Sequence, residues 1–193
     1  MAGRGRRDAI ENRGEAAVRR TLSERFVSGD YHLLNNLTVP DGDGTTQVDH
    51  VLVSRFGIFV LESKHYSGWI YGSERNATWT QVLYKKHYKF QNPLRQNYKH
   101  VKVVSGLLDF LSSEFIHPIV VFTGEAVFKT PTPSGVMSLK QLSDHLADFK
   151  TEVLSQNRLE FCVGRLECHR KTLSRQTDVE HIADLNRRFG DLA

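Results

Sequence analysis

The pattern of apolar and polar positions predicts helices that alternate with strands. In residues 8–27 the apolar positions recur every three or four residues, which predicts an amphipathic helix. Glu15 lies three residues before Val18, and therefore on or beside the stripe of this helix that faces the core. Residues 31–39 predict the first strand, and the turn-forming residues at 40–44 predict a loop after it.

Two apolar runs come next, and they carry the candidate chemistry. Residues 47–54 and 57–64 predict consecutive strands that form an antiparallel hairpin. Side chains in a strand alternate between faces with a rise of about 3.3 Å per residue, so Glu62 and Lys64 share one face and Asp49 can lie near Glu62. Ionised side chains are seldom buried unless they are paired or bound to a metal, so these charges indicate a function.

The rest of the pattern completes a compact α/β fold, a central mixed β-sheet flanked by helices. The short apolar run at 118–122 is typical of a central strand that is covered on both faces. Asn92-Pro93 predicts the start of a helix that continues through Leu111, because proline is favoured in the first helical turn. No repeat or linker divides the chain, so residues 1–193 are predicted to form a single domain. Further strands are expected at 69–71, 77–84 and 135–139, and further helices at 141–154 and 178–189.

Composition bounds the class of protein. With 193 residues, of which 39% are hydrophobic, the chain can bury a substantial core. No apolar run reaches the roughly 18 residues of a membrane span and the N-terminus lacks the apolar core of a secretory signal, so a cytoplasmic protein without membrane contact is expected. The two cysteines, Cys162 and Cys168, give no disulfide framework. A zinc site made from them with His169 and His181 is disfavoured, because the spacing matches no standard zinc motif.

Basic residues are distributed unevenly. The net charge is +4, but residues 75–108 contain seven basic residues and no acidic ones, with aromatic residues interleaved. Lysine and arginine neutralise phosphates and aromatic rings stack on exposed bases, so this segment favours nucleic acid; a solvated basic surface is an equal alternative. The candidate contacts to a DNA backbone, which would convey no sequence preference, are Lys85, Lys86, Lys89, Arg95 and Lys99.

Three further residues are expected to be structural. Trp69 and Trp79 are predicted as core or sheet-face residues, in preference to base-stacking platforms. His50 directly follows Asp49 and therefore points to the opposite face of the strand, where packing or a hydrogen bond is expected.

Asp49, Glu62 and Lys64 have the chemistry of a metal-dependent phosphodiester hydrolase. Magnesium binds one or two carboxylates with water and phosphate, so Asp49 and Glu62 are suitable ligands. Lys64 can position the attacking water or stabilise the pentavalent phosphorus. Glu15 can add a ligand directly or through water, and Gln96 can orient water or phosphate. Taken alone this triplet is a weak signal, because edge-strand charges or an exposed ion pair produce the same pattern.

The chain resembles the nuclease-related domain (NERD) family in five motifs at sensible distances. The motifs are Gly14-Glu15, the segments 47–53, 57–64 and 68–72, and Asn92-Pro93-Leu94-Arg95-Gln96-Asn97. The likeness covers about residues 12–122, which leaves a C-terminal extension at 123–193. It implies the PD-(D/E)xK nuclease superfamily with its restriction-endonuclease-like core, and a catalytic centre of Asp49, Glu62 and Lys64 with Glu15 and Gln96 accessory.

The resemblance also implies Mg²⁺ or Mn²⁺ as cofactor, with Asp49, Glu62, Ser63 and Glu15 as the metal ligands. Ser63 stands where the family usually has threonine, a minor departure because a backbone carbonyl is the contribution expected there. The leading hypothesis is a metal-dependent nuclease that acts on DNA. The alternatives are a non-catalytic nucleic-acid-binding module with the same fold, and an interaction scaffold unrelated to nucleic acid. The strandedness of the substrate, attack from an end or internally, and formation of a homodimer are left open.

Overall fold

A computed structural model describes the backbone of residues 4–171 and the side chains of residues 13–171. The predicted helix at 178–189 lies outside the described residues. Four α-helices and nine strands are present in the described part. In chain order they are α1 (Arg4–Arg25), β1 (Tyr31–Asp41), β2 (Gly44–Ser54), β3 (Gly57–Lys64), β4 (Gly68–Tyr71), β5 (Thr78–Leu83), β6 (Lys86–Gln91), α2 (Pro93–Leu107), a short 3-10 helix (Ser113–Phe115), β7 (Ile116–Phe122), β8 (Ala126–Phe128), β9 (Val136–Ser138), α3 (Leu139–Ala147) and α4 (Gln156–His169).

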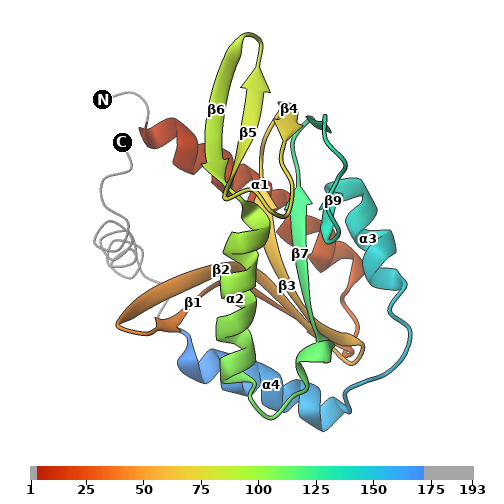
Figure 1. Cartoon of the computed structure of the whole chain (residues 1–193). Coiled ribbons are helices and arrows are strands. Elements are labelled where there is room, and N and C mark those ends of the chain that lie inside the picture. Colours follow the sequence, from red (N-terminus) through yellow and green to blue (C-terminus); the bar gives the residue numbers. More distant parts are fainter. Residues whose placement is uncertain (1–3, 172–193) are drawn as a thin grey trace.

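The larger of two sheets has the strand order β1-β2-β3-β7-β9 (Figure 1). β1, β2 and β3 pair antiparallel, whereas β3, β7 and β9 pair parallel, so the sheet is mixed. The predicted hairpin of β2 and β3 and the predicted central strand β7 are both confirmed. The α/β class, with a central mixed sheet and flanking helices, is therefore confirmed as well.

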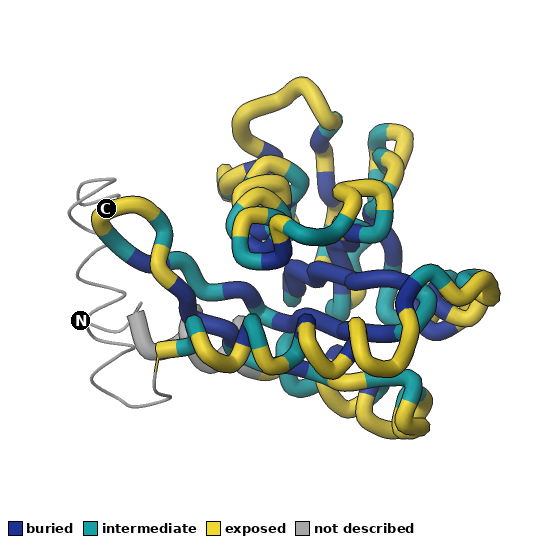
Figure 2. The backbone as a smooth tube through the Cα atoms, turned by 90° about the horizontal axis from the view of Figure 1, so that it is seen from below, coloured by how far each residue is buried: buried dark blue, intermediate teal, exposed yellow. Residues whose placement is uncertain are grey.

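Alternation along β3 divides the core into two layers. Ile58 and Val60 face the cluster that contains α2 and α4, whereas Phe59 and Leu61 face the cluster that contains α1 and α3. Helices thus cover both faces of the sheet, and seen from below the buried backbone runs between helices that expose their outer sides (Figure 2). The period of two places Glu62 on the α2 side, in line with Ile58 and Val60.

A smaller sheet, with the order β6-β5-β4-β8, lies beyond the C-terminal ends of β3 and β7 (Figure 1). Its inner face is closed by Ile70 and Trp79, which pack with Val120 and Phe122 of β7. The Trp79 and Phe122 rings stack with centroids 6.3 Å apart. Gly72 is required at this contact, because a Cβ there would lie 2.3 Å from the Trp79 ring.

Several element boundaries differ from the sequence-based prediction. β6, β8 and α4 were not predicted. α2 ends at Leu107 instead of Leu111, since Leu108 and Leu111 extend the apolar period through a turn closed by Leu111 N–H to Leu108 O at 2.9 Å. α3 spans 139–147 instead of 141–154 and begins with a capping box formed by Ser138 and Gln141.

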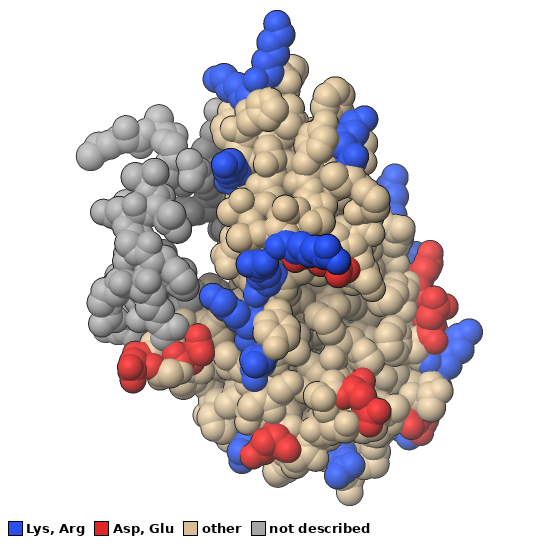
Figure 3. Space-filling model, viewed as in Figure 1, with Lys and Arg blue, Asp and Glu red and all other residues tan. Residues whose placement is uncertain are grey.

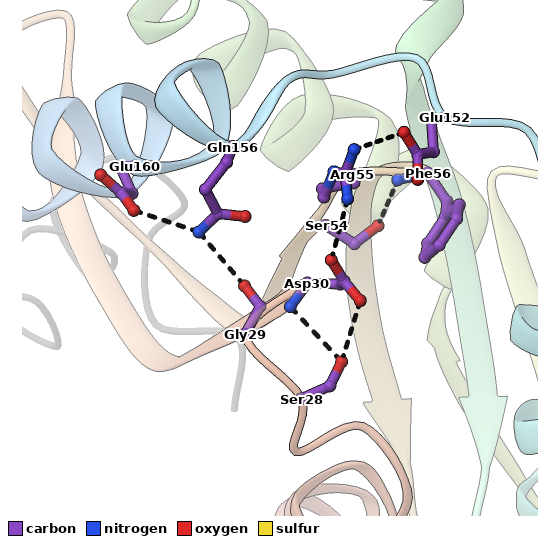
Figure 4. A network of polar contacts seen from close by, with 9 residues as sticks. All are labelled: Ser28, Gly29, Asp30, Ser54, Arg55, Phe56, Glu152, Gln156 and Glu160. Carbon is purple, nitrogen blue, oxygen red and sulfur yellow. Dashed lines mark hydrogen bonds and ion pairs between the residues drawn. The ribbon is translucent and has the colours of Figure 1, made fainter.

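The predicted helix at 141–154 is wrong in its second half because the backbone there bonds to the β2–β3 turn. The N–H groups of Val153 and Leu154 both donate to the carbonyl of Arg55, at 2.8 and 2.9 Å. The Arg55 side chain pairs with Asp30 at 3.3 Å and also with Glu152 (Figure 4). These contacts join the loop that leads into α4 to the β2–β3 turn. Each half-exposed ion pair contributes little stability by itself.

α4 belongs to the C-terminal extension at 123–193, and it packs on the large sheet together with α2. Leu159, Cys162 and Leu166 of α4 are buried in the cluster that holds Val104 and Leu108 of α2. No helix in the described part of the chain is both long and apolar enough to cross a membrane.

The two thiols test this packing. Burial raises the pKa of Cys162 to about 11, whereas Cys168, on the same helix, is exposed. Because the thiolate is the reactive form, one thiol per chain is expected to react quickly with a disulfide reagent at pH 8 and the second only after denaturation. The Cys168→Ser variant should lose the fast phase. Two fast phases of equal rate in the native protein would contradict the packing of α4.

Candidate active site

The end of β3 holds a nearly fully buried group of ionisable side chains. Glu62 is 1% exposed, and its Oε1 lies 2.6 Å from the Lys64 Nζ. The second oxygen, Oε2, lies 3.4 Å from Nδ1 of His100, which projects from α2. Removing charged groups from water is costly, and the stability of such a pair depends on close contact between the partners. The predicted sharing of one face by Glu62 and Lys64 is thus observed, and the two are in direct contact.

Asp49 lies on the neighbouring strand β2. The β2–β3 ladder pairs His50 with Leu61, and the same register continued by one residue places Asp49 opposite Glu62. Instead of a further ladder bond, the Asp49 Oδ2 accepts hydrogen bonds from the N–H and the hydroxyl of Ser63, both at 2.7 Å. The carboxylate is therefore held at the end of β3 by the residue between Glu62 and Lys64.

The strand on the other side of Asp49 is irregular at the same level. β1 pairs with β2 through Asn35 and Leu37, but Asn36, which lies opposite Asp49, has a φ of 49°. Asparagine tolerates this left-handed conformation better than most residues. Asp49 therefore lacks a ladder partner on both sides. Such departures from regular strand geometry concentrate at functional sites.

Two neighbouring residues attach α2 to this site. Asn97 is fully buried, and its amide donates hydrogen bonds to the carbonyls of Val60 in β3 and Ile119 in β7, both at 3.0 Å. Gln96, one residue earlier, is half-buried in the first turns of the helix. The hydrogen bonds of Asn97 thus fix both Gln96 and His100 relative to β3.

Glu15 is half-buried in α1, on the side of the sheet opposite α2. The neighbouring Gly14 shows how closely this helix approaches the end of β3. A Cβ on Gly14 would lie 3.0 Å from both His65 Cβ and Thr123 Oγ1. The structure thus brings Glu15 to the level of the Glu62 end of the strand.

His50 points away from Glu62, as the strand period predicts. Its Nδ1 lies 2.7 Å from Oδ1 of Asn35, and burial lowers the pKa of its imidazole to about 4, against the opposing effect of the Asp49 carboxylate. At neutral pH the ring is therefore neutral and does not compensate the charge of Asp49.

The donor set fits a hard divalent cation that keeps part of its water shell. Asp49 and Glu62 offer carboxylate oxygens, and Asp49 Oδ1 makes no hydrogen bond within the described residues. No three His, Cys, Asp or Glu side chains among residues 13–171 converge on one point, so Glu15 does not join Asp49 and Glu62 in a single cluster. One or two carboxylates completed by water and substrate phosphate is the usual arrangement for Mg²⁺.

The candidate DNA-contacting residues come from two elements. Lys85 and Lys86 lie at the exposed tip of the β5–β6 hairpin, and Lys89 is exposed on β6. Figure 3 shows basic side chains at the tip of this hairpin and acidic side chains only in the middle and lower parts of the view. Arg95 and Lys99 are exposed on α2, where Arg95 also donates to the carbonyl of Arg75 at 2.7 Å.

Sequence reasoning missed His100 as a site residue and assigned no role to Asn97. A signal was present, because Asn97, His100 and Val104 follow one another at three- and four-residue steps and all three are buried. Polar side chains on the core-facing stripe of a helix need partners, and here those partners are strand carbonyls and Glu62.

Comparison with known proteins agrees with this geometry. The family model described as nuclease-related domain matches residues 10–123. An uncharacterized protein of Bacillus anthracis is 36% identical over 174 residues, which cover 88% of this chain and 71% of that protein. The chain therefore belongs to the nuclease-related domain family, and this membership supports a nuclease-type function.

The comparison with solved structures gave a weak match. The small subunit of the heterodimeric restriction endonuclease R.BspD6I aligns over 83% of this chain and 90% of that subunit, with 13% identity and a TM-score of 0.31.

Proposed function

We propose that the protein is a metal-dependent nuclease that hydrolyses phosphodiester bonds in DNA. The observation that carries the proposal is the buried contact of Glu62 with Lys64, beside an Asp49 carboxylate that Ser63 holds in place. A buried ion pair is seldom more stable than well-packed apolar residues of similar size, so stability alone does not account for this pair, and its presence supports a functional role.

Asp49 and Glu62 are the residues that would hold Mg²⁺ or Mn²⁺, and the Ser63 carbonyl would be a further ligand. Glu15 would contact the ion through a water molecule. When bound, such an ion lowers the pKa of a water and offsets charge on the scissile phosphate.

The protein's own groups then have separate tasks. Lys64 presents an ammonium group to the phosphate oxygens or to the attacking water, and charge placed there stabilises the transition state. His100 contacts the Glu62 oxygen that Lys64 does not, and thereby orients the carboxylate. Gln96 offers a neutral amide for a hydrogen bond to water or phosphate. Lys85, Lys86, Lys89, Arg95 and Lys99 are proposed to bind the DNA backbone without sequence preference.

The experiment is a cleavage assay on supercoiled, linear and single-stranded circular DNA, with Mg²⁺, Mn²⁺ or EDTA. Product is expected only with a divalent ion, and the substrates that are cut separate internal from terminal attack. The competing hypothesis, a non-catalytic nucleic-acid-binding module, predicts equal DNA binding in all three buffers and no product. That result would overturn the proposal.

A further inference from the structure

The outward face of the small sheet exposes aromatic and apolar side chains to solvent. We call this surface the outer sheet face and define it by Trp69 and Tyr71 of β4, Val127 of β8, Lys89 of β6 and Lys129. Trp69 is 49% exposed, Tyr71 38% and Val127 50%. Trp69 and Val127 are direct neighbours in the ladder between β4 and β8. A continuous apolar surface of this kind on a soluble protein marks a binding site more often than chance exposure.

The charged residues within the strands of this face are basic, whereas the acidic Glu125 directly precedes β8 and its carbonyl accepts a hydrogen bond from the Gly68 N–H at 3.1 Å. The four strands of the small sheet contain no aspartate or glutamate. Lys89 and Tyr71 lie on either side of β5, since both pair with Thr80 of that strand. The Lys129 Nζ lies 4.6 Å from the centroid of the Trp69 ring. Exposed aromatic rings beside lysines, on strands that contain no acidic residue, are complementary to a ligand that carries both flat bases and phosphates.

We propose that the outer sheet face binds single-stranded nucleic acid, with Trp69 and Tyr71 stacking on unpaired bases and Lys89 and Lys129 contacting phosphates. Bases in a duplex are stacked on one another and cannot reach these rings, so the surface distinguishes single strands from double strands. This inference deepens the proposed function, on which it rests, by naming the strand state of the substrate.

The outer sheet face lies near the candidate active site along the chain. β4 follows β3 after a short link, so the Cα atoms of Lys64 and Trp69 are at most about 18 Å apart. A strand held on the outer sheet face can therefore continue towards Glu62. When a base stacks on Trp69, the Lys129 ammonium leaves the ring and turns to a phosphate.

The two tryptophans of the chain make a direct test available. Trp79 is fully buried and its indole N–H donates to the carbonyl of Ser73, whereas Trp69 is half-exposed. The probe is an oligothymidylate of about 16 nucleotides, titrated in EDTA so that binding is measured without metal-dependent cleavage. Quenching of tryptophan fluorescence is expected in the wild type and should disappear in Trp69→Phe, in which only Trp79 fluoresces.

The second measurement compares the affinities of variants for oligothymidylate and for a duplex. Trp69→Leu and Tyr71→Ala are each expected to weaken oligothymidylate binding about fivefold or more, while affinity for a duplex of the same length stays within about twofold. Trp69→Phe, which still stacks, should retain most of the affinity. The matched control is Phe161→Leu, which changes an exposed aromatic residue on α4 and should have no effect.

Three results would overturn the inference. The first is unchanged affinity in Trp69→Leu and Tyr71→Ala, and the second is an equal loss for single and double strands. The third is a wild-type dimer in sedimentation that Trp69→Leu converts to a monomer without loss of binding, which would identify the outer sheet face as a contact between two copies. Because the assay contains EDTA, a protein that binds in this way but cuts nothing would support the inference while contradicting the proposed nuclease activity.

Discussion

Replacement of Lys64 by methionine is expected to lower the rate of metal-dependent DNA cleavage by a factor of at least about 100. Lys64 is the positive group in contact with Glu62, and methionine preserves the length of the side chain without its charge. Removal of a preorganised charged donor from a buried site has a large effect because water cannot replace it. The measurement is the initial rate of plasmid cleavage at saturating Mg²⁺ or Mn²⁺.

The control for this variant is its stability. Loss of one partner of a buried ion pair costs about 3–5 kcal/mol, because the other charge is left without compensation. The double variant Glu62→Gln with Lys64→Met removes both charges and is therefore expected to unfold at a higher urea concentration than the single variant while it stays inactive. Cleavage by folded Lys64→Met at a rate near that of the wild type would place the catalytic centre elsewhere.

Replacement of Asn97 by leucine is expected to lower the free energy of unfolding by about 2–4 kcal/mol. The substitution removes the two hydrogen bonds to Val60 and Ile119 and leaves both carbonyls buried without this donor. Urea denaturation followed by circular dichroism measures the change.

The neighbouring Gln96 gives a matched comparison for this prediction. Gln96 lies on the same helix turn and makes no side-chain hydrogen bond within the described residues, so Gln96→Leu should change stability by less than about 0.5 kcal/mol. Its expected effect is on the cleavage rate. Equal destabilisation by the two substitutions would show that Asn97 does not attach α2 to the sheet.

The strand period predicts part of the site from sequence alone. Alternation of side chains is a local property, so the shared face of Glu62 and Lys64 follows without knowledge of any other element. The hairpin that brings Asp49 to the next strand is also a local feature, because few residues separate β2 from β3.

The rest of the site depends on contacts between distant segments. His100 reaches Glu62 only because α2 crosses β3, and nothing in the sequence near His100 encodes that crossing. The hydrogen bonds between Asp49 and Ser63 arise where the β2–β3 ladder ends, which no periodic pattern reveals. The second half of the helix predicted at 141–154 is absent for a related reason, since the backbone of residues 153 and 154 bonds to the distant carbonyl of Arg55.

The different burial of the two tryptophans could not be predicted from the sequence. Both were predicted as core or sheet-face residues, and the structure separates them by the face of the small sheet that each occupies. Trp79 belongs to the inner face and is fully buried, whereas Trp69 belongs to the outer sheet face and is half-exposed. This difference depends on which side of the sheet β7 covers, and that is decided by tertiary packing.

Binding of Mn²⁺ measured by titration calorimetry tests the central claim most directly, namely that Asp49 and Glu62 together hold one catalytic divalent ion. The wild-type protein is expected to bind one Mn²⁺ per chain, and Asp49→Asn and Glu62→Gln should each weaken this binding at least about tenfold, as loss of a charged ligand does. Glu160→Gln, on α4, is the control and should bind as the wild type does. Absence of binding in the wild type, or equal affinity in all four proteins, would contradict the account.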